Sequence, residues 1–287
     1  MKRIMWFFVS VLLTVSTAVS AREIQFDVDA AMAAAHANDK PVATPVATTA
    51  PRQAVVGETV SYGELGGSPL NGYLAKPASA SGDLPALIVI HEWWGLNDNV
   101  RKTAERWAAE GYVALAIDLY GGESAATPKE AMALRMKLKE DNPTGEANVR
   151  QAYAYLNDEI KAPRIGVIGW CMGGRWSLKS ALLFPDGIDA MVMYYGSVIT
   201  DEEQLATLQM PILGNFARED PVIPIESVHE FRNTLEKLEK NVDIKIYPNA
   251  KHAFSNPSGM AYNPEAAADA WNRSTSFLAY HLSGDGS

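Results

Sequence analysis

The stretch Ile165-Gly-Val-Ile-Gly-Trp-Cys-Met-Gly-Gly174 decides how this chain folds. Its first six residues are mostly apolar, as a strand covered on both faces requires, and a helical pattern begins at Met172. Cys171 therefore stands on a sharp turn from strand to helix, with glycines on both sides that let the backbone fold back without a clash. A side chain on such a turn points away from the sheet, which is the position of an accessible nucleophile.

The helix that follows the turn also favours chemistry at Cys171. Its free amide groups and the positive end of its dipole point at the turn, where they stabilise a thiolate and an oxyanion alike. The alternative is a buried structural cysteine whose glycines merely close a turn, which is the ordinary role of an isolated cysteine. Glycine at 169, 173 and 174, together with the passage from strand to helix, favours the nucleophile.

A cysteine nucleophile needs a base, and the base needs a carboxylate that orients it. Asp220 follows the apolar run Ile212–Ala217, and His252 follows the run Val242–Tyr247. Hydrolases that carry the nucleophile on this kind of turn have the chain order nucleophile, acid, base. The order here is the same, so we predict a triad of Cys171, Asp220 and His252.

Other residues compete less well for these roles. Glu219 adjoins Asp220 and is an alternative acid, but it is expected to be a solvated loop charge. The remaining histidines are expected elsewhere: His36 in a linker, His91 in packing or loop shaping, and His229 and His281 on helix surfaces.

Working outward from the turn, short apolar runs alternate with amphipathic helical ones. Expected strands are Glu58–Tyr62, Asn71–Ala75, Ala86–Ile90, Val113–Leu119, Ile165–Trp170, Ile188–Tyr195, Ile212–Ala217 and Val242–Tyr247. Expected helices lie at Asn99–Glu110, Pro128–Asp158, Met172–Phe184, Ile225–Lys240 and Pro264–His281. This alternation predicts an α/β fold with a mostly parallel central sheet and helices on both faces. Its active groups belong on loops at the carboxyl ends of strands.

The loop after Ala86–Ile90 reads His91-Glu92-Trp93-Trp94-Gly95. In such folds this loop supplies one backbone amide of the oxyanion hole, here that of Trp93, and the amide of Met172 supplies the other. Glu92 is unusual because a carboxylate in an apolar loop is costly unless it is partnered, although an ordinary solvated glutamate is the alternative. Trp94 and Tyr120 are our candidates for the substrate pocket; the tryptophans are alternatively part of the core.

Composition limits the possible partners. The chain has 287 residues, of which 47% are hydrophobic and 21% charged, and its formal net charge is −9. Its length suits one sizeable core, and its acidity disfavours nucleic acid and anionic membrane surfaces as partners. The expected partner is a small molecule. Cys171 is the only cysteine, so an intramolecular disulfide is impossible.

The N-terminus predicts export. Lys2 and Arg3 precede an uncharged apolar run from Ile4 to Val19, and small residues follow it up to Ala21. This layout is typical of a signal peptide, residues 1–21, that is cleaved to leave no stable membrane association; a retained membrane anchor is the alternative. We expect an Ala/Thr/Pro-rich, poorly ordered linker at 22–53 and the folded domain at 54–287.

Taken together, these motifs resemble the dienelactone hydrolase family over residues 56 to 283. The residues that carry the resemblance are Ile90–Asn97, Gly111–Val113, Asp118–Tyr120, Gly169–Gly174, Tyr194–Gly196, Asp220 and His252–Phe254. The resemblance implies an α/β-hydrolase fold. It also implies that Glu92 matches a family glutamate that holds the resting thiol and exchanges a proton with Cys171 when substrate arrives.

The sequence departs from the family pattern where members that act on dienelactone present two arginines to the substrate carboxylate. Those positions are Gly122 and Asn256 here. We therefore predict hydrolysis of carboxylic ester or lactone bonds through a cysteinyl acyl-enzyme, without metal or cofactor, on substrates other than dienelactone. An amide or peptide hydrolase and a non-catalytic binding protein on the same fold are the alternatives.

Overall fold

The computed structural model describes residues 28–41, 44, 49–79, 82–138 and 143–283. The strands are β1 (Val55–Leu65), β2 (Ser68–Pro77), β3 (Ala86–Ile90), β4 (Val113–Ile117), β5 (Ile165–Trp170), β6 (Ala190–Tyr194), β7 (Ile212–Ala217) and β8 (Val242–Tyr247). The helices are α1 (Val28–Ala35), α2 (Asp98–Ala109), α3 (Pro128–Leu138), α4 (Pro143–Ala154), α5 (Met172–Leu183), α6 (Glu202–Ala206), α7 (Ile225–Lys237) and α8 (Pro264–Leu282). A π-helical turn, Tyr155–Glu159, extends α4.

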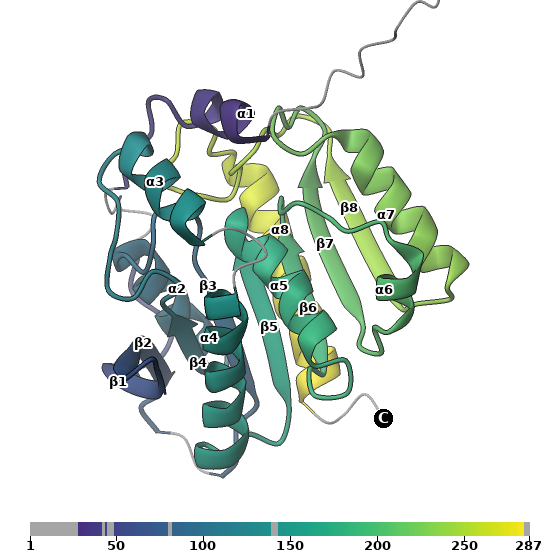
Figure 1. The fold of residues 1–287 in the computed structure, drawn as a ribbon. Coiled ribbons are helices and arrows are strands. Elements are labelled where there is room, and N and C mark those ends of the chain that lie inside the picture. The colour runs from purple at the N-terminus through teal and green to yellow at the C-terminus, as the bar shows by residue number, and fades with distance from the viewer. Residues whose placement is uncertain (1–27, 42–43, 45–48, 80–81, 139–142, 284–287) are drawn as a thin grey trace, which may run out of the picture.

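The strands form one sheet in the order β1-β2-β4-β3-β5-β6-β7-β8. β2 pairs antiparallel with β1 and with β4, whereas all other neighbours are parallel. Helices cover both faces of the sheet (Figure 1). The fold is that of the α/β hydrolases, and the predicted mostly parallel sheet is confirmed.

Central strands are buried on both faces, which is why they read as continuous apolar runs. Every residue of β3, β4, β6 and β7 is buried. The edge strand β8 is only partly buried, and polar residues alternate with apolar ones along it. The bounds of β5, β7 and β8 agree with the sequence prediction, since each run is flanked by clear turn or helix signals.

The β1–β2 hairpin turns at Gly66 and Gly67. Both residues have positive φ, 58° and 80°, a conformation that glycine adopts without strain and that suits a two-residue hairpin turn. The short helix α6 was not predicted. It is one turn long and begins at Asp201, whose side chain accepts a hydrogen bond from the amide of Gln204.

The N-terminal segment differs from the linker predicted at 22–53. Residues 28–35 form α1, which lies across the carboxyl-end edge of the sheet (Figure 1). Met32, His36 and Asp39 are buried in the domain. This helix was hard to predict because α1 is rich in alanine, so its order depends on contacts with distant residues instead of on hydrophobic periodicity.

The predicted signal peptide, residues 1–21, lies outside the described residues. Within the described ranges, no helix combines the length and apolar character needed to span a membrane.

Candidate active site

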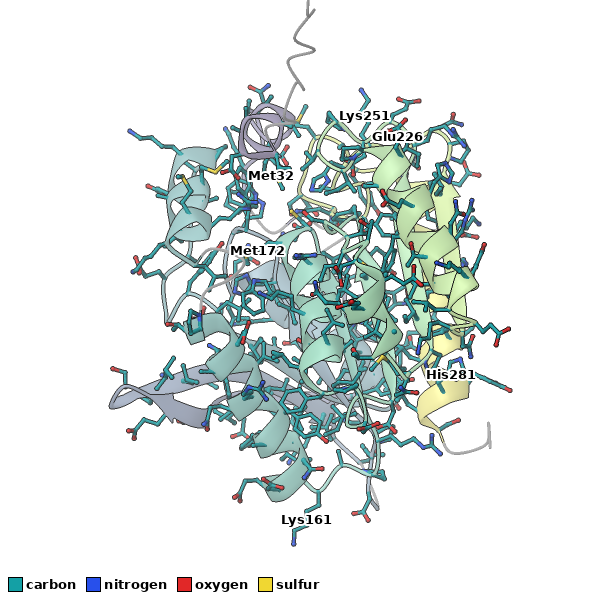
Figure 2. The ribbon with its side chains drawn as sticks, turned by 45° about the vertical axis from the view of Figure 1, so that its right-hand side comes forward. Met32, Lys161, Met172, Glu226, Lys251 and His281 are labelled. Carbon is teal, nitrogen blue, oxygen red and sulfur yellow. The ribbon has the colours of Figure 1, made fainter. Side chains whose placement is uncertain are left out.

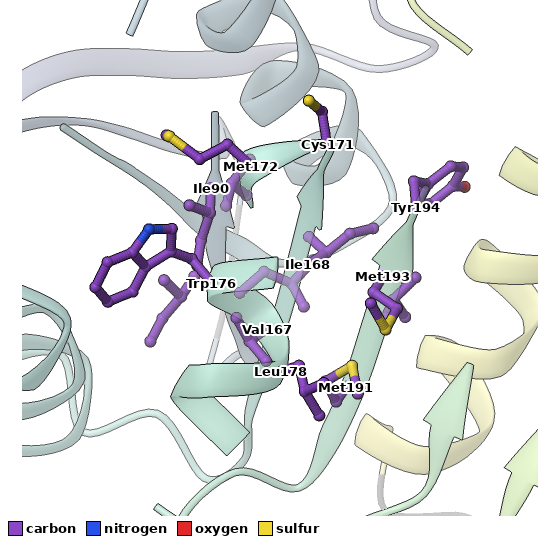
Figure 3. Close-up of a cluster of buried hydrophobic side chains, with 14 of the residues drawn as sticks. Ile90, Val167, Ile168, Cys171, Met172, Trp176, Leu178, Met191, Met193 and Tyr194 are labelled. Atoms are coloured by element: carbon purple, nitrogen blue, oxygen red, sulfur yellow. The ribbon is translucent and has the colours of Figure 1, made fainter. Parts of the chain in front are cut away.

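The turn at Cys171 has the predicted strained geometry. Cys171 has φ 54° and ψ −117°, between the end of β5 and the start of α5. A Cβ atom at residue 169 would lie 2.2 Å from the carbonyl oxygen of Gly173, and one at residue 173 would lie 2.3 Å from that of Ile90. Only glycine fits at either position. Figure 3 shows the result: Cys171 stands at the tip of β5 with its sulfur directed away from the apolar cluster beneath it.

His252 and Asp220 meet Cys171 from the ends of two other strands. Asp220 follows β7 and His252 follows β8, so both lie at the edge of the sheet where β5 ends. Nε2 of His252 is 3.2 Å from Sγ of Cys171, and its Nδ1 is 2.9 Å from Oδ2 of Asp220. Both side chains of the His252–Asp220 pair are almost fully buried. The three predicted residues are thus in one hydrogen-bonded line.

Asp220 is fixed by its own backbone contacts. Its Oδ1 accepts hydrogen bonds from the amides of Val222, at 2.7 Å, and Ile223, at 2.9 Å. With the carboxylate held in this way, Nδ1 of His252 donates to it, and Nε2 is left as the acceptor that faces the thiol. The arrangement sets the tautomer that a general base requires.

Burial raises the pKa of the Cys171 thiol, and the nearby Glu92 carboxylate acts in the same direction. The imidazole of His36 and the backbone amide of Met172 act in the opposite direction, but burial dominates. The thiol is therefore protonated at rest, and it requires a base to become a nucleophile.

Glu92 is partly buried in its apolar loop, and this burial raises its pKa. Its Oε1 accepts a hydrogen bond from the hydroxyl of Tyr195 at 3.2 Å, and its Oε2 accepts one from Nδ2 of Asn256. Both carboxylate oxygens are thus taken by residues other than the thiol. The proton exchange with Cys171 that the family resemblance implies requires Glu92 to turn from these partners.

Of the two predicted oxyanion amides, that of Met172 lies beside the Cys171 sulfur. The Met172 amide interacts with the Cys171 sulfur, and Trp93 is fully buried in the loop after β3. The Tyr120 hydroxyl donates to the carbonyl oxygen of Trp93 at 3.1 Å and lies 3.2 Å from Sδ of Met172. Tyr120 thus contacts both of the segments predicted to supply these amides, and its ring is packed in the core.

Trp94 lines a small cavity of about 60 Å³ together with Glu92, Tyr195 and Asn256. A larger cavity of about 510 Å³ shares Asn99, Thr103, Trp170, Ser255 and Pro257 with it. Arg106 and Trp271 also line the larger cavity, with the guanidinium carbon 3.7 Å from the ring centre. The lining described for the two cavities includes Glu92 and Tyr195 but none of the three triad residues.

The other histidines named in the sequence analysis fall into two groups. His91 is fully buried; its Nε2 accepts from the amide of Leu119 at 3.1 Å, so it shapes its loop as predicted. His229 and His281 lie on α7 and α8, and Glu219 is exposed on its loop. None of these three is in the triad.

His36 was assigned to a linker, and that prediction was wrong. Its Nδ1 lies 2.7 Å from Oδ2 of Asp39, and its ring centre is 5.5 Å from that of His252. Burial by itself would lower the pKa of His36, but the Asp39 carboxylate and Cys171 raise it to about 9. A second histidine–carboxylate pair thus lies beside Cys171 and His252.

Met32 completes the cover over the nucleophile. Its Sδ is 3.8 Å from Sγ of Cys171, so α1 packs directly against Cys171. Figure 2 labels Met32 on α1, above Met172 at the start of α5. The sequence signal was the Met32-x₃-His36 spacing, which places both side chains on one helical face, followed by Asp39.

Comparison with known proteins gives a consistent result. The family model described as "Dienelactone hydrolase family" matches residues 70–282. "Protein usf" of Aquifex pyrophilus is 32% identical over 234 residues, which cover 79% of this chain and all of that protein. A Bradyrhizobium protein named "Probable 2-oxo-3-(5-oxofuran-2-ylidene)propanoate lactonase" is 30% identical over 225 residues, covering 74% of this chain and 90% of its own. The structure of dienelactone hydrolase from Anabaena variabilis superposes with a TM-score of 0.61 at 19% identity, covering 79% of this chain and 99% of that one, and supports the fold.

Proposed function

The chain belongs to the dienelactone hydrolase family, a family of hydrolases, and from that premise we propose that it cleaves carboxylic ester or lactone bonds with Cys171 as nucleophile. The observation that carries the proposal is the line from Asp220 through His252 to Cys171, with 2.9 Å and 3.2 Å between the bonded atoms. This line joins a base of fixed tautomer to a thiol on a strained turn, and such an arrangement is suited to acyl transfer.

The proposed reaction has two steps. In the first, His252 takes the thiol proton at Nε2 while Sγ of Cys171 attacks the carbonyl carbon, and the oxyanion is held by the amides of Trp93 and Met172. Collapse of the intermediate transfers the proton from His252 to the leaving alkoxide and leaves a thioester on Cys171. In the second step His252 activates a water molecule, which releases the acid and restores the thiol. Asp220 stabilises the imidazolium that forms in each step.

We expect the preferred substrates to be neutral. A carboxylate that enters a partly apolar pocket loses hydration, and only a cationic partner recovers that loss. Gly122 has no side chain to offer, and the amide of Asn256 is engaged by Glu92. Arg106, in the larger cavity, is the cation placed best to reverse this preference.

Export completes the proposal. The charged, apolar and small-residue layout of residues 1–21 supports cleavage after Ala21 and release of a protein that starts at Arg22. The intact mass of the exported protein tests this step, and retention of residues 1–21 in a membrane fraction would oppose it.

A substrate panel tests the reaction class. The purified chain is assayed on neutral esters, lactones and matched amides, with Cys171→Ala as the blank. Ester or lactone hydrolysis that disappears in the blank supports the proposal. Preferential amide cleavage would favour the peptidase alternative, and binding without any turnover would favour a non-catalytic protein on this fold.

A further inference from the structure

Four side chains with soft or borderline donor atoms converge above the turn at Cys171. They are the Cys171 thiol, the Met32 thioether and the imidazoles of His36 and His252. One donor atom from each of the three residues Cys171, His36 and His252 lies within 4.8 Å of the other two. Sδ of Met32 is 3.8 Å from Sγ of Cys171. The four residues come from three segments that are distant in the sequence: α1 and its end, the end of β5, and the loop after β8. The cluster therefore exists only in the folded chain.

The spacing of the sulfur atoms is that of two ligands on one ion. Sulfur ligands that are each about 2.3 Å from a tetrahedral ion lie about 3.8 Å apart. A sulfur at that distance and an imidazole nitrogen about 2.0 Å from the ion lie about 3.5 Å apart. The observed separations are 3.8 Å between the sulfurs and 3.2 Å between Sγ of Cys171 and Nε2 of His252. These two pairs need an adjustment of only a few tenths of an ångström, and His36, whose donor atom lies within 4.8 Å of those of Cys171 and His252, has to move further in.

Both imidazoles are oriented in the way that metal ligands are. Nδ1 of His36 is held by Asp39 at 2.7 Å, and Nδ1 of His252 is held by Asp220 at 2.9 Å. Metal-binding histidines commonly donate their second ring N–H to a carboxylate, which fixes the ring and strengthens the ligand. Asp39 is itself held, because its Oδ1 accepts from the amide of Met260 at 2.8 Å.

The remaining nitrogen of His36 faces the thiol of Cys171. His36 is 2% exposed, and its side chain interacts with this thiol, but Nε2 makes no hydrogen bond of normal geometry to any residue that the structure describes. A buried polar atom without a partner is costly, and each such atom needs an explanation. Coordination of an ion between His36 and Cys171 would satisfy it.

We propose that Met32, His36, Cys171 and His252 bind one copper ion, taken up as Cu(I). Thiolate and thioether ligands with imidazoles select soft ions, and a Cys-His-His set with a methionine at a fourth position is a copper environment. Zinc is the competing ion for Cys and His ligands, but its usual ligands do not include a thioether. From the sequence we predicted no metal, and we placed Met32 and His36 in a linker, away from Cys171.

A bound ion would switch off the hydrolase, and this part rests on the proposed function. Copper displaces the thiol proton of Cys171 and takes the lone pair of Nε2 of His252, so both nucleophile and base are occupied. It also ties α1 to the turn through Met32 and His36, which keeps substrate from the thiol. Removal of the ion returns the proton to Cys171 and frees the helix to move.

The binding test does not require activity. The protein from Arg22 onward, reduced and kept without oxygen, is titrated with Cu(I) against a chromogenic Cu(I) chelator, and in parallel with Zn(II). We expect one Cu(I) per chain, bound more tightly than Zn(II). Met32→Leu and His36→Gln should each weaken Cu(I) binding by at least tenfold, and Asp39→Asn by about 10–100-fold. Met136→Leu and His229→Gln, which change the same residue types on α3 and α7, are the matched controls and should leave the affinity unchanged.

Three results would overturn the proposal: no stoichiometric Cu(I), affinity that Met32→Leu and His36→Gln both leave unchanged, or Zn(II) bound more tightly than Cu(I). Two substitutions at different positions keep the test decisive if one variant does not fold.

Hydrolysis is measured separately, with each variant compared with its own chelator-treated form. Copper should lower wild-type hydrolysis by at least tenfold, and full activity in the copper-loaded protein would refute the switch. If copper binds but the metal-free chain hydrolyses nothing, the metal site stands and the proposed function fails.

Discussion

Replacing Asp220 by Asn tests how the triad sets the state of its base. Oδ1 of Asp220 accepts from the amides of Val222 and Ile223, so an asparagine that keeps these bonds must place its carbonyl oxygen there. Its NH₂ group then occupies the position of Oδ2, 2.9 Å from Nδ1 of His252. Because this group donates, the shorter contact of Nδ1 favours the tautomer with its proton on Nε2. Oδ1 also lies 3.1 Å from Nδ1, but it already accepts from two backbone amides. The base then presents an N–H to the thiol and cannot take its proton.

The opposite orientation of the asparagine is unfavourable. It would turn the NH₂ group toward two backbone N–H donors and leave both without an acceptor, at a cost of about 1–3 kcal/mol each. The wrong tautomer is therefore the expected state. In a related triad the same exchange lowers kcat by about 10⁴, which corresponds to about 5.5 kcal/mol of transition-state stabilisation. We expect a loss of about 10³–10⁴ in kcat here.

The assay is hydrolysis of a neutral p-nitrophenyl ester by chelator-treated protein. Glu219→Gln removes the adjacent exposed carboxylate and is the control, with activity expected within about twofold of wild type, as is usual for a surface change. If Asp220→Asn retains more than a tenth of wild-type kcat while folded, the reasoning about the tautomer is refuted.

Three further predictions concern the turn, the thiol and the substrate. Gly169→Ala should lower the free energy of unfolding by about 3 kcal/mol, measured by urea denaturation, because the new Cβ would lie 2.2 Å from a backbone oxygen; wild-type stability would contradict the strained turn. Iodoacetamide should add one adduct per chain, at Cys171, and the rate should rise with pH because burial raises the pKa of this thiol; a rate independent of pH between 7 and about 10 would disagree. A neutral ester should have a higher kcat/KM than its carboxylate-bearing analogue, and a tenfold preference for the anion that is lost in Arg106→Met would assign the missing clamp to Arg106 instead.

The sheet and the triad were accessible from sequence for physical reasons. A parallel strand buried on both faces has to be apolar throughout, so β5 and β7 were found with their bounds. The bounds of β8, the partly buried edge strand, agree as well. The residues after those strands necessarily share one edge of the sheet, which brought Cys171, Asp220 and His252 together without knowledge of side-chain positions.

The segment that lies over the site, α1 with His36 and Asp39, could not be predicted in this way. α1 has one buried large apolar side chain, Met32, in a run of small residues, so its periodicity carries almost no signal. What orders this segment is long-range: the contact of Met32 with Cys171 and the hydrogen bond from Met260 to Asp39. Tyr120 was predicted to line the pocket, whereas its hydroxyl bond to Trp93 draws it into the core.

The most direct test of the central claim is the mass of the protein during turnover. Chelator-treated chain is mixed with a slowly deacylating p-nitrophenyl ester, quenched in acid within seconds, and examined by intact mass spectrometry and peptide mapping. The account predicts one acyl group per chain, on the peptide that contains Cys171, formed together with a burst of p-nitrophenol. Steady hydrolysis with no acyl group on Cys171, or the same hydrolysis by Cys171→Ala, would contradict it.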